Sequence, residues 1–385
     1  MAFISIGKID KNLIPMITGC IFCFLNRILN QYDGSLLFKN QIMMNIYIST
    51  SKLFTIIPFI LLKINSKKVS SNDIQIIKNQ QALKYMNKSE AKRIIAGKWG
   101  FIFLAVMIYF VNQIFFVLTI KVHSNTTILN ILITSLFYYL IFKIKLYRHH
   151  YLSIILIIIV GFIIDMILGN LLFDIDNNLG LFFFRLLREV LFSLSSVVDK
   201  YILEKKFGSV YEILLTNGVI TSTLFIIFAI IDHNFFGIYN YEEYFNNFDT
   251  TELLVASGVI ITQLGLNVSI LFTNKNNSPC HIFIIFIFGQ LAYYIDFSGS
   301  DAIIIFCLII ILFLSFVFNE ILEINFLGLS DNTKKNISKR AEDEDNMIIT
   351  KSDTYDSMLE GQDGYILKSK DFKSIESDAV DEKDE

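Results

Sequence analysis

Long apolar runs alternate with short polar segments along the first 322 residues of the chain. A helix that crosses the hydrocarbon core of a bilayer, about 30 Å thick, needs about 20 apolar residues. Ten runs approach this length, and each predicts a membrane-spanning helix. They cover residues 13–29, 42–62, 99–120, 126–142, 151–169, 179–203, 210–231, 252–273, 279–295 and 302–322. The pattern predicts an all-α integral membrane protein with ten transmembrane helices.

The composition strengthens this prediction. Of 385 residues, 54% are hydrophobic and 18% are charged, whereas a soluble domain has about 25% charged residues. A soluble chain of this composition would have to expose many of its phenylalanine, isoleucine and leucine side chains to water. All four cysteines lie in apolar runs, which excludes a secreted disulfide scaffold. For the Cys20-x-x-Cys23 pair we therefore expect core packing rather than redox chemistry.

The charges of the loops predict the orientation. With the N-terminus in the cytosol, the loops on that side, including the long loop 63–98, hold 16 basic residues, and the opposite loops hold two. This asymmetry satisfies the positive-inside rule, and ten spans place both termini in the cytosol. Residues 323–385 contain 17 acidic and 9 basic residues and few aromatics, which predicts a disordered acidic cytosolic tail.

A short internal repeat suggests how the spans are organised. Residues 118–128, between spans three and four, and residues 272–282, between spans eight and nine, both follow the pattern T-x-K-x-x-S-x-x-x-I. The two segments occupy equivalent places in two five-span halves, 1–172 and 173–322. Because five is odd, the halves must face opposite ways. Inverted repeats of this kind are typical of alternating-access transporters, which bind their substrate between the repeats.

Phrases in the second half resemble segments of the drug/metabolite transporter superfamily, in the family's order. They are Val198-Asp199-Lys200-Tyr201, Tyr211-Glu212 with Asn217-Gly218, Thr273 to Pro279, and Phe318-Asn319-Glu320. Over about residues 13–325 the chain is similar to the solute carrier family 35 branch related to its F subfamily. Asn217 stands where this family usually has Glu. The resemblance implies a carrier of nucleotide-linked or phosphorylated anions first and amine-like compounds second, and it allows a homodimer.

Polar residues within the spans are the candidate substrate pathway, because an ionisable group at the centre of a span costs at least about 2.5 kcal/mol. On the sixth span, five of them lie within about 60° of one line at 100° per residue: Arg185, Arg188, Glu189, Ser196 and Asp199. One interpretation is a stripe that faces a cavity, where an Arg fork binds phosphate or carboxylate. The other is a structural Arg185–Glu189 pair one helical turn apart, which leaves Arg188 without a partner on its own helix.

Further polar residues lie on counterpart spans of the two halves. Asn112 and Gln113 on the third span and Gln263 and Asn267 on the eighth are expected either to bind a solute or to hold helices together. Lys52 is expected to snorkel or to line the pathway, and Arg27 to snorkel. His123 and His281 have no third ligand at a suitable spacing, so no metal or cofactor is expected.

The chain contains no sequence motif of a hydrolase, metalloprotease or nucleotide-driven pump, so we expect a secondary transporter rather than an enzyme. The alternative is a membrane scaffold that has kept the fold and presents its tail to partners. Nothing indicates nucleic-acid binding. The tail contains Tyr355-Asp356-Ser357-Met358 and an acidic signal ending in Ile348-Ile349, which resemble addresses bound by sorting adaptors. They predict residence in an internal membrane, either Golgi or endolysosomal.

Overall fold

A computed structural model of the chain describes residues 4–6, 11–30, 40–65, 88–119, 129–143, 146–167, 175–206, 208–246, 248–294, 301–324 and 333. The chain divides into two compact units, Met1–Leu329 and Ser330–Glu385. The first contains all the helices and strands of the described residues. In the second, the structure describes Thr333 alone, so both sorting motifs lie outside the described residues.

Each of the ten predicted segments coincides with a helix or with a run of joined helices. The first half contains η1 (Lys11–Leu13), α1 (Ile14–Asn30), α3 (Gln41–Ser51), η2 (Lys52–Thr55), α4 (Ile56–Asn65), α6 (Lys88–Thr119), α7 (Leu129–Phe142) and α8 (Arg148–Ile167). The second half contains α9 (Ile175–Lys205), α10 (Val210–Ile231), η5 (Asp232–Phe236), α11 (Tyr241–Asn246), α12 (Thr250–Asn276), α13 (His281–Gln290), η6 (Leu291–Tyr294) and α14 (Asp301–Phe318).

Several of these helices suit a bilayer by length and composition. Among the described residues, four stretches are long and apolar enough to cross one: Gln41–Leu61, Ala96–Val117, Val210–Phe236 and Thr250–Asn276. Five further apolar helices are shorter, at 10–17 residues. These features support an all-helical membrane protein.

The surface of the helices shows the same adaptation to lipid. On α1 the exposed large hydrophobic side chains recur every three or four residues, at Ile14, Ile17, Ile21, Leu25 and Ile28. The opposite face of α1 is buried and includes the polar Asn26. Exposed apolar stripes of this length would promote aggregation in water, whereas acyl chains solvate them without cost. The apolar face of α1 is therefore suited to contact lipid.

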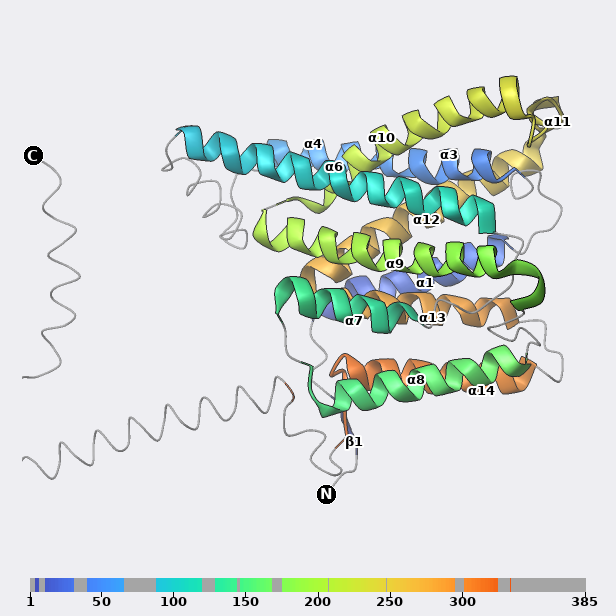
Figure 1. The fold of residues 1–385 in the computed structure, drawn as a ribbon. Helices are drawn as coiled ribbons and strands as arrows, with labels where there is room; N and C mark the ends of the chain where they lie inside the picture. Colours follow the sequence, from blue (N-terminus) through green and yellow to red (C-terminus); the bar gives the residue numbers. More distant parts are fainter. Residues whose placement is uncertain are drawn as a thin grey trace, which may run out of the picture. The chain divides into compact units, whose positions relative to one another are not determined.

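The helices run side by side, and their contacts bring the two halves together (Figure 1). Helix α1 packs against α12 and α13, and α9 packs against α6 and α7. Helix α3 contacts α10, and α8 pairs with α14. A cluster of buried aliphatic residues fills the contact between α8 and α14, including Ile157, Ile164, Leu308 and Ile311. Among the described residues, the most extensive helix contacts therefore join one half to the other.

Two short strands were not predicted from the sequence. Strand β1 (Ile4–Ile6) pairs antiparallel with β2 (Leu322–Ile324), in the register Ile4 to Ile324, Ser5 to Glu323 and Ile6 to Leu322. Residues 323 and 324, which the composition assigned to the disordered tail, are therefore folded, and Glu323 is buried. The pairing places the segment before the first helix beside the segment after the last one.

Candidate functional site

A cavity of about 210 Å³ lies between the helices of the two halves. Its wall is built by residues of seven helices. They are Cys23, Asn26, Arg27 and Asn30 of α1, Met44 and Ile48 of α3, Tyr109, Asn112, Gln113 and Phe116 of α6, Asn130 of α7, Arg188, Glu189 and Phe192 of α9, Gln263, Leu266, Asn267 and Ile270 of α12, and Phe286 of α13. Amides, two arginines and a carboxylate thus share the wall with aromatic and aliphatic side chains.

The cavity brings together six of the nine residues that the sequence marked as a substrate pathway. Arg188, Glu189, Asn112, Gln113, Gln263 and Asn267 all line it. The remaining three residues of the stripe on the sixth span are not in the wall. Arg185 and Ser196 are buried elsewhere along α9, and Asp199 lies near Lys52. Of the five polar residues on this face of the sixth span, only the neighbours Arg188 and Glu189 therefore line the cavity.

Glu189 is the centre of a polar network in this wall. Its Oε1 accepts a hydrogen bond from the Arg188 guanidinium at 2.6 Å, and its Oε2 accepts one from Asn130 Nδ2 at 2.5 Å. Ser193 Oγ in turn donates to Asn130 Oδ1 at 2.8 Å. The expectation that Arg188 lacks a partner on its own helix is wrong, because the neighbouring carboxylate pairs with it. The network links α9 to α7 and fixes the guanidinium at the cavity, since a buried carboxylate requires such donors.

Arg188 nevertheless remains open to the cavity. Its side chain is 21% exposed, whereas that of Glu189 is 3% exposed. The guanidinium carbon lies 5.6 Å from the centre of the Phe116 ring, a cation–π distance. A guanidinium carries five N–H donors, so the contact with Glu189 leaves donors that can face a solute.

Arg27 is a cavity residue that the sequence interpretation missed. Its guanidinium donates a hydrogen bond to Tyr293 Oη at 2.5 Å and lies 5.2 Å from the centre of that ring. We expected this arginine to reach toward the membrane surface, because it lies near the end of α1. Tyr293, which is close to Arg27 only in the folded chain, holds its guanidinium where it also lines the cavity. No signal in the sequence joins residues so far apart.

Lys52 forms a second polar cluster, directly behind the cavity wall. The residue is 1% exposed, and its Nζ donates to Asn217 Oδ1 at 3.0 Å. The same nitrogen lies 3.5 Å from the centre of the ring of Tyr109, and Tyr109 lines the cavity. Asp199 on α9 interacts electrostatically with it. Lys52 therefore neither snorkels nor lines the cavity, and Asn217 serves as its hydrogen-bond acceptor.

A third cluster holds the C-terminal ends of α9 and α12 together. Lys200, 2% exposed, donates from Nζ to the carbonyl oxygens of Asn274 at 2.7 Å, Lys275 at 3.2 Å and Asn277 at 2.5 Å. It also pairs with Glu204 one turn further along α9 at 2.7 Å. The last carbonyls of a helix lack partners within the helix, so this ammonium caps α12.

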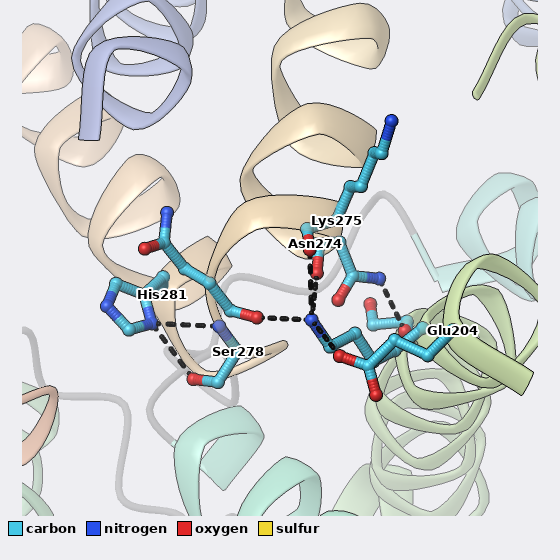
Figure 2. Close-up of polar contacts among 8 residues, drawn as sticks. Glu204, Asn274, Lys275, Ser278 and His281 are labelled. Carbon is cyan, nitrogen blue, oxygen red and sulfur yellow. Dashed lines mark hydrogen bonds and ion pairs between the residues drawn. The ribbon is translucent and has the colours of Figure 1, made fainter. Parts of the chain in front are cut away.

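Figure 2 shows that this cap continues into the turn before α13. Asn274 Nδ2 donates back to the Ser196 carbonyl of α9 at 2.6 Å. Ser278 Oγ lies 2.9 Å from His281 Nδ1, at the start of α13. The side chain of Lys275 points away from the cluster (Figure 2). Ser196 thus contributes through its backbone carbonyl, a role that the helical-wheel pattern does not indicate.

No protein-family model matches the chain, and no curated protein is similar to it in sequence. The function is therefore inferred from the cavity and from the way in which the helices pair.

Proposed function

We propose that the chain is a secondary transporter that carries a small organic solute by alternating access, with the cavity as its binding site. The observation that carries the proposal is the position of Arg188, a partly open guanidinium in the wall of a cavity between two halves of a membrane protein. An arginine within a membrane-spanning segment is costly unless it has a use. A scaffold has no need for the charged and amide side chains that converge on this space.

The helix contacts support an inverted repeat. If the ten helical segments are numbered in order, a shift by five converts the contact of α1 with α12 into that of α9 with α6. The same shift converts the contact of α1 with α13 into that of α9 with α7, and it leaves the pairs α3–α10 and α8–α14 unchanged. This is the symmetry expected of two five-span halves related by a two-fold axis in the membrane plane.

The pairing of β1 with β2 supports an even number of crossings. These strands lie just before the first helical segment and just after the last, so both ends of the spanning region are on one side. The loops on the same side as the N-terminus hold the excess of basic residues, so that side is the cytosol. Ten crossings, with both termini cytosolic, fit both observations.

The cavity also narrows the class of solute. Two arginines, Arg27 and Arg188, face it with the single carboxylate of Glu189, and that carboxylate already accepts two hydrogen bonds. This balance favours an anion whose phosphate or carboxylate matches an arginine fork. The volume of about 210 Å³ is below the roughly 300–1,000 Å³ of sites for drug-sized ligands. A small phosphorylated or carboxylated metabolite fits a cavity of this volume better than an entire nucleotide-sugar does.

Uptake into proteoliposomes tests the proposal. The wild type, Arg188→Ala and Arg188→Lys are compared on a panel of sugar phosphates, organic acids, nucleotide-sugars and amines. We expect uptake of an anionic member, at least about tenfold loss in Arg188→Ala, and partial loss in Arg188→Lys, because Lys keeps the charge without the fork. Arg148→Ala, an exposed position outside the cavity, is the matched control and retains uptake.

Two outcomes would contradict the proposal. If correctly inserted wild-type protein carries no member of the panel, the scaffold alternative gains support. If uptake is equal in the wild type and Arg188→Ala, the guanidinium is structural and the binding site lies elsewhere. Arg185→Ala is expected to reduce the amount of folded protein instead, because Arg185 is buried away from the cavity wall.

A further inference from the structure

Three potential metal ligands meet where α8 begins and α14 ends. His149 and His150 lie in the first turn of α8, and Glu320 lies in the turn between α14 and β2. One ligand atom from each of the three side chains can be chosen so that all lie within 4.8 Å of one another. Glu320 Oε1 is 3.3 Å from His149 Nε2. Neither α8 nor α14 contributes a residue to the cavity wall described above.

His149 is the residue that points to a missing ligand. It is 3% exposed, and neither of its ring nitrogens has a hydrogen-bond partner among the described residues. The short approach of Glu320 to Nε2 lacks the geometry of a hydrogen bond. Buried polar groups without partners are rare, because each loses its hydrogen bonds to water without replacement. A bound cation would satisfy the His149 imidazole.

The surrounding residues hold the three side chains in place. The His149 and His150 rings are 4.0 Å apart between centroids, Tyr147 stacks on His149, and Phe318 meets His150 edge-on. The turn that carries Glu320 is fixed by backbone hydrogen bonds from Glu320 N to Val317 O at 3.1 Å and from Ile321 N to Phe316 O at 2.9 Å. The ligands therefore come from two elements that are already fixed before any ion binds.

We propose that His149, His150 and Glu320 bind a zinc ion that joins the start of α8 to the end of α14. Two imidazole nitrogens and one carboxylate are a common donor set for Zn²⁺, with water as the fourth ligand. Calcium and magnesium prefer oxygen ligands alone, so this set does not suit them. The site is separate from the proposed solute cavity, and it ties together the fifth and tenth helical segments.

The structure also ranks the two histidine ligands. His149 is buried with both nitrogens available, whereas His150 Nδ1 already accepts a hydrogen bond from the Tyr147 amide at 3.1 Å. To bind zinc through either nitrogen, His150 has to give up this bond, because Nε2 becomes available only when its proton moves to Nδ1. We therefore expect His150→Asn to weaken zinc binding less than His149→Asn.

The test uses the full chain, purified in detergent and stripped with a chelator. Zinc is titrated against a competing chelator, and bound metal is counted per chain. We expect one tightly bound zinc in the wild type, an affinity at least about tenfold lower in His149→Asn and in Glu320→Gln, and a zinc-dependent rise in melting temperature that both variants lose. His233→Asn, an exposed histidine outside the cluster, is the matched control and keeps wild-type affinity.

X-ray absorption of the zinc-loaded wild type gives a result that does not depend on whether a variant folds. Nitrogen and oxygen neighbours without sulfur support the site, whereas sulfur neighbours would assign the zinc to the buried cysteines. The proposal is overturned if the wild type binds no stoichiometric zinc, or if folded Glu320→Gln binds it as tightly as the wild type does.

Discussion

Replacing Lys200 by Met tests the cap that holds α9 to α12. Methionine keeps most of the stem and removes the ammonium, so three carbonyls lose their donor. Asn274 is fully buried, whereas Lys275 is exposed and Asn277 is half-buried, so water replaces the donor only at the last two. One buried acceptor left unsatisfied costs about 1–3 kcal/mol. The lost positive charge at the helix C-terminus adds up to about 1 kcal/mol.

The sum is about 1–4 kcal/mol, and the melting temperature in detergent is the assay. At roughly 2 °C per kcal/mol for a large domain, we expect a fall of about 2–8 °C at a fixed scan rate. Lys275→Met is the matched control, because the same change occurs at the same helix end on a side chain that points away from the cluster (Figure 2). Because Lys275 also lies in the last turn of α12, this control loses the helix-end charge but no hydrogen bond of the cap, and it should alter stability by no more than about 1 kcal/mol.

A second variant separates the cap from the ion pair. The Glu204 side chain is 41% exposed, so its pair with Lys200 contributes at most about 1 kcal/mol, and Glu204→Gln should have a small effect. The reasoning is refuted if Lys200→Met melts like the wild type. It is also refuted if Glu204→Gln lowers the melting temperature as much as Lys200→Met, because the ion pair would then be the main contribution.

Three further predictions follow from other parts of the molecule. Gly218→Leu should destabilise the protein by about 1–3 kcal/mol in the same melting assay, because a Cβ there would lie 2.9 Å from Lys52 Cβ, whereas Gly100→Leu, with open space around it, should be neutral. Tags at both termini should be accessible from the cytosol in selectively permeabilised cells, and a C-terminal tag reachable only from the opposite side would exclude ten spans. Imaging should show that replacing Tyr355, Ile348 and Ile349 by Ala redistributes the protein, and an unchanged distribution would remove the tail motifs as sorting signals.

The sequence alone determined the helical segments of this protein. A bilayer imposes one strong requirement, which is that backbone polar groups are satisfied within each apolar run, and this makes such runs helical wherever they occur. For that reason the ten predicted segments agree with the helices, and even the break at Lys52 leaves the second segment helical. The periodicity on α9 also placed Arg188 and Glu189 on one face, because side-chain direction along a helix follows from its pitch.

The tertiary structure alone decided which of these polar residues meet. The pairing of Glu189 with Asn130, of Arg27 with Tyr293 and of Lys52 with Asn217 joins helices that are distant in the chain. Helical pitch gives the direction of a side chain but not the neighbour that it finds, so Arg27 was expected at the membrane surface and Arg188 was expected to be unpaired. The short strands next to the first and last helices have the same origin, since β1 acquires a partner only when packing brings β2 beside it.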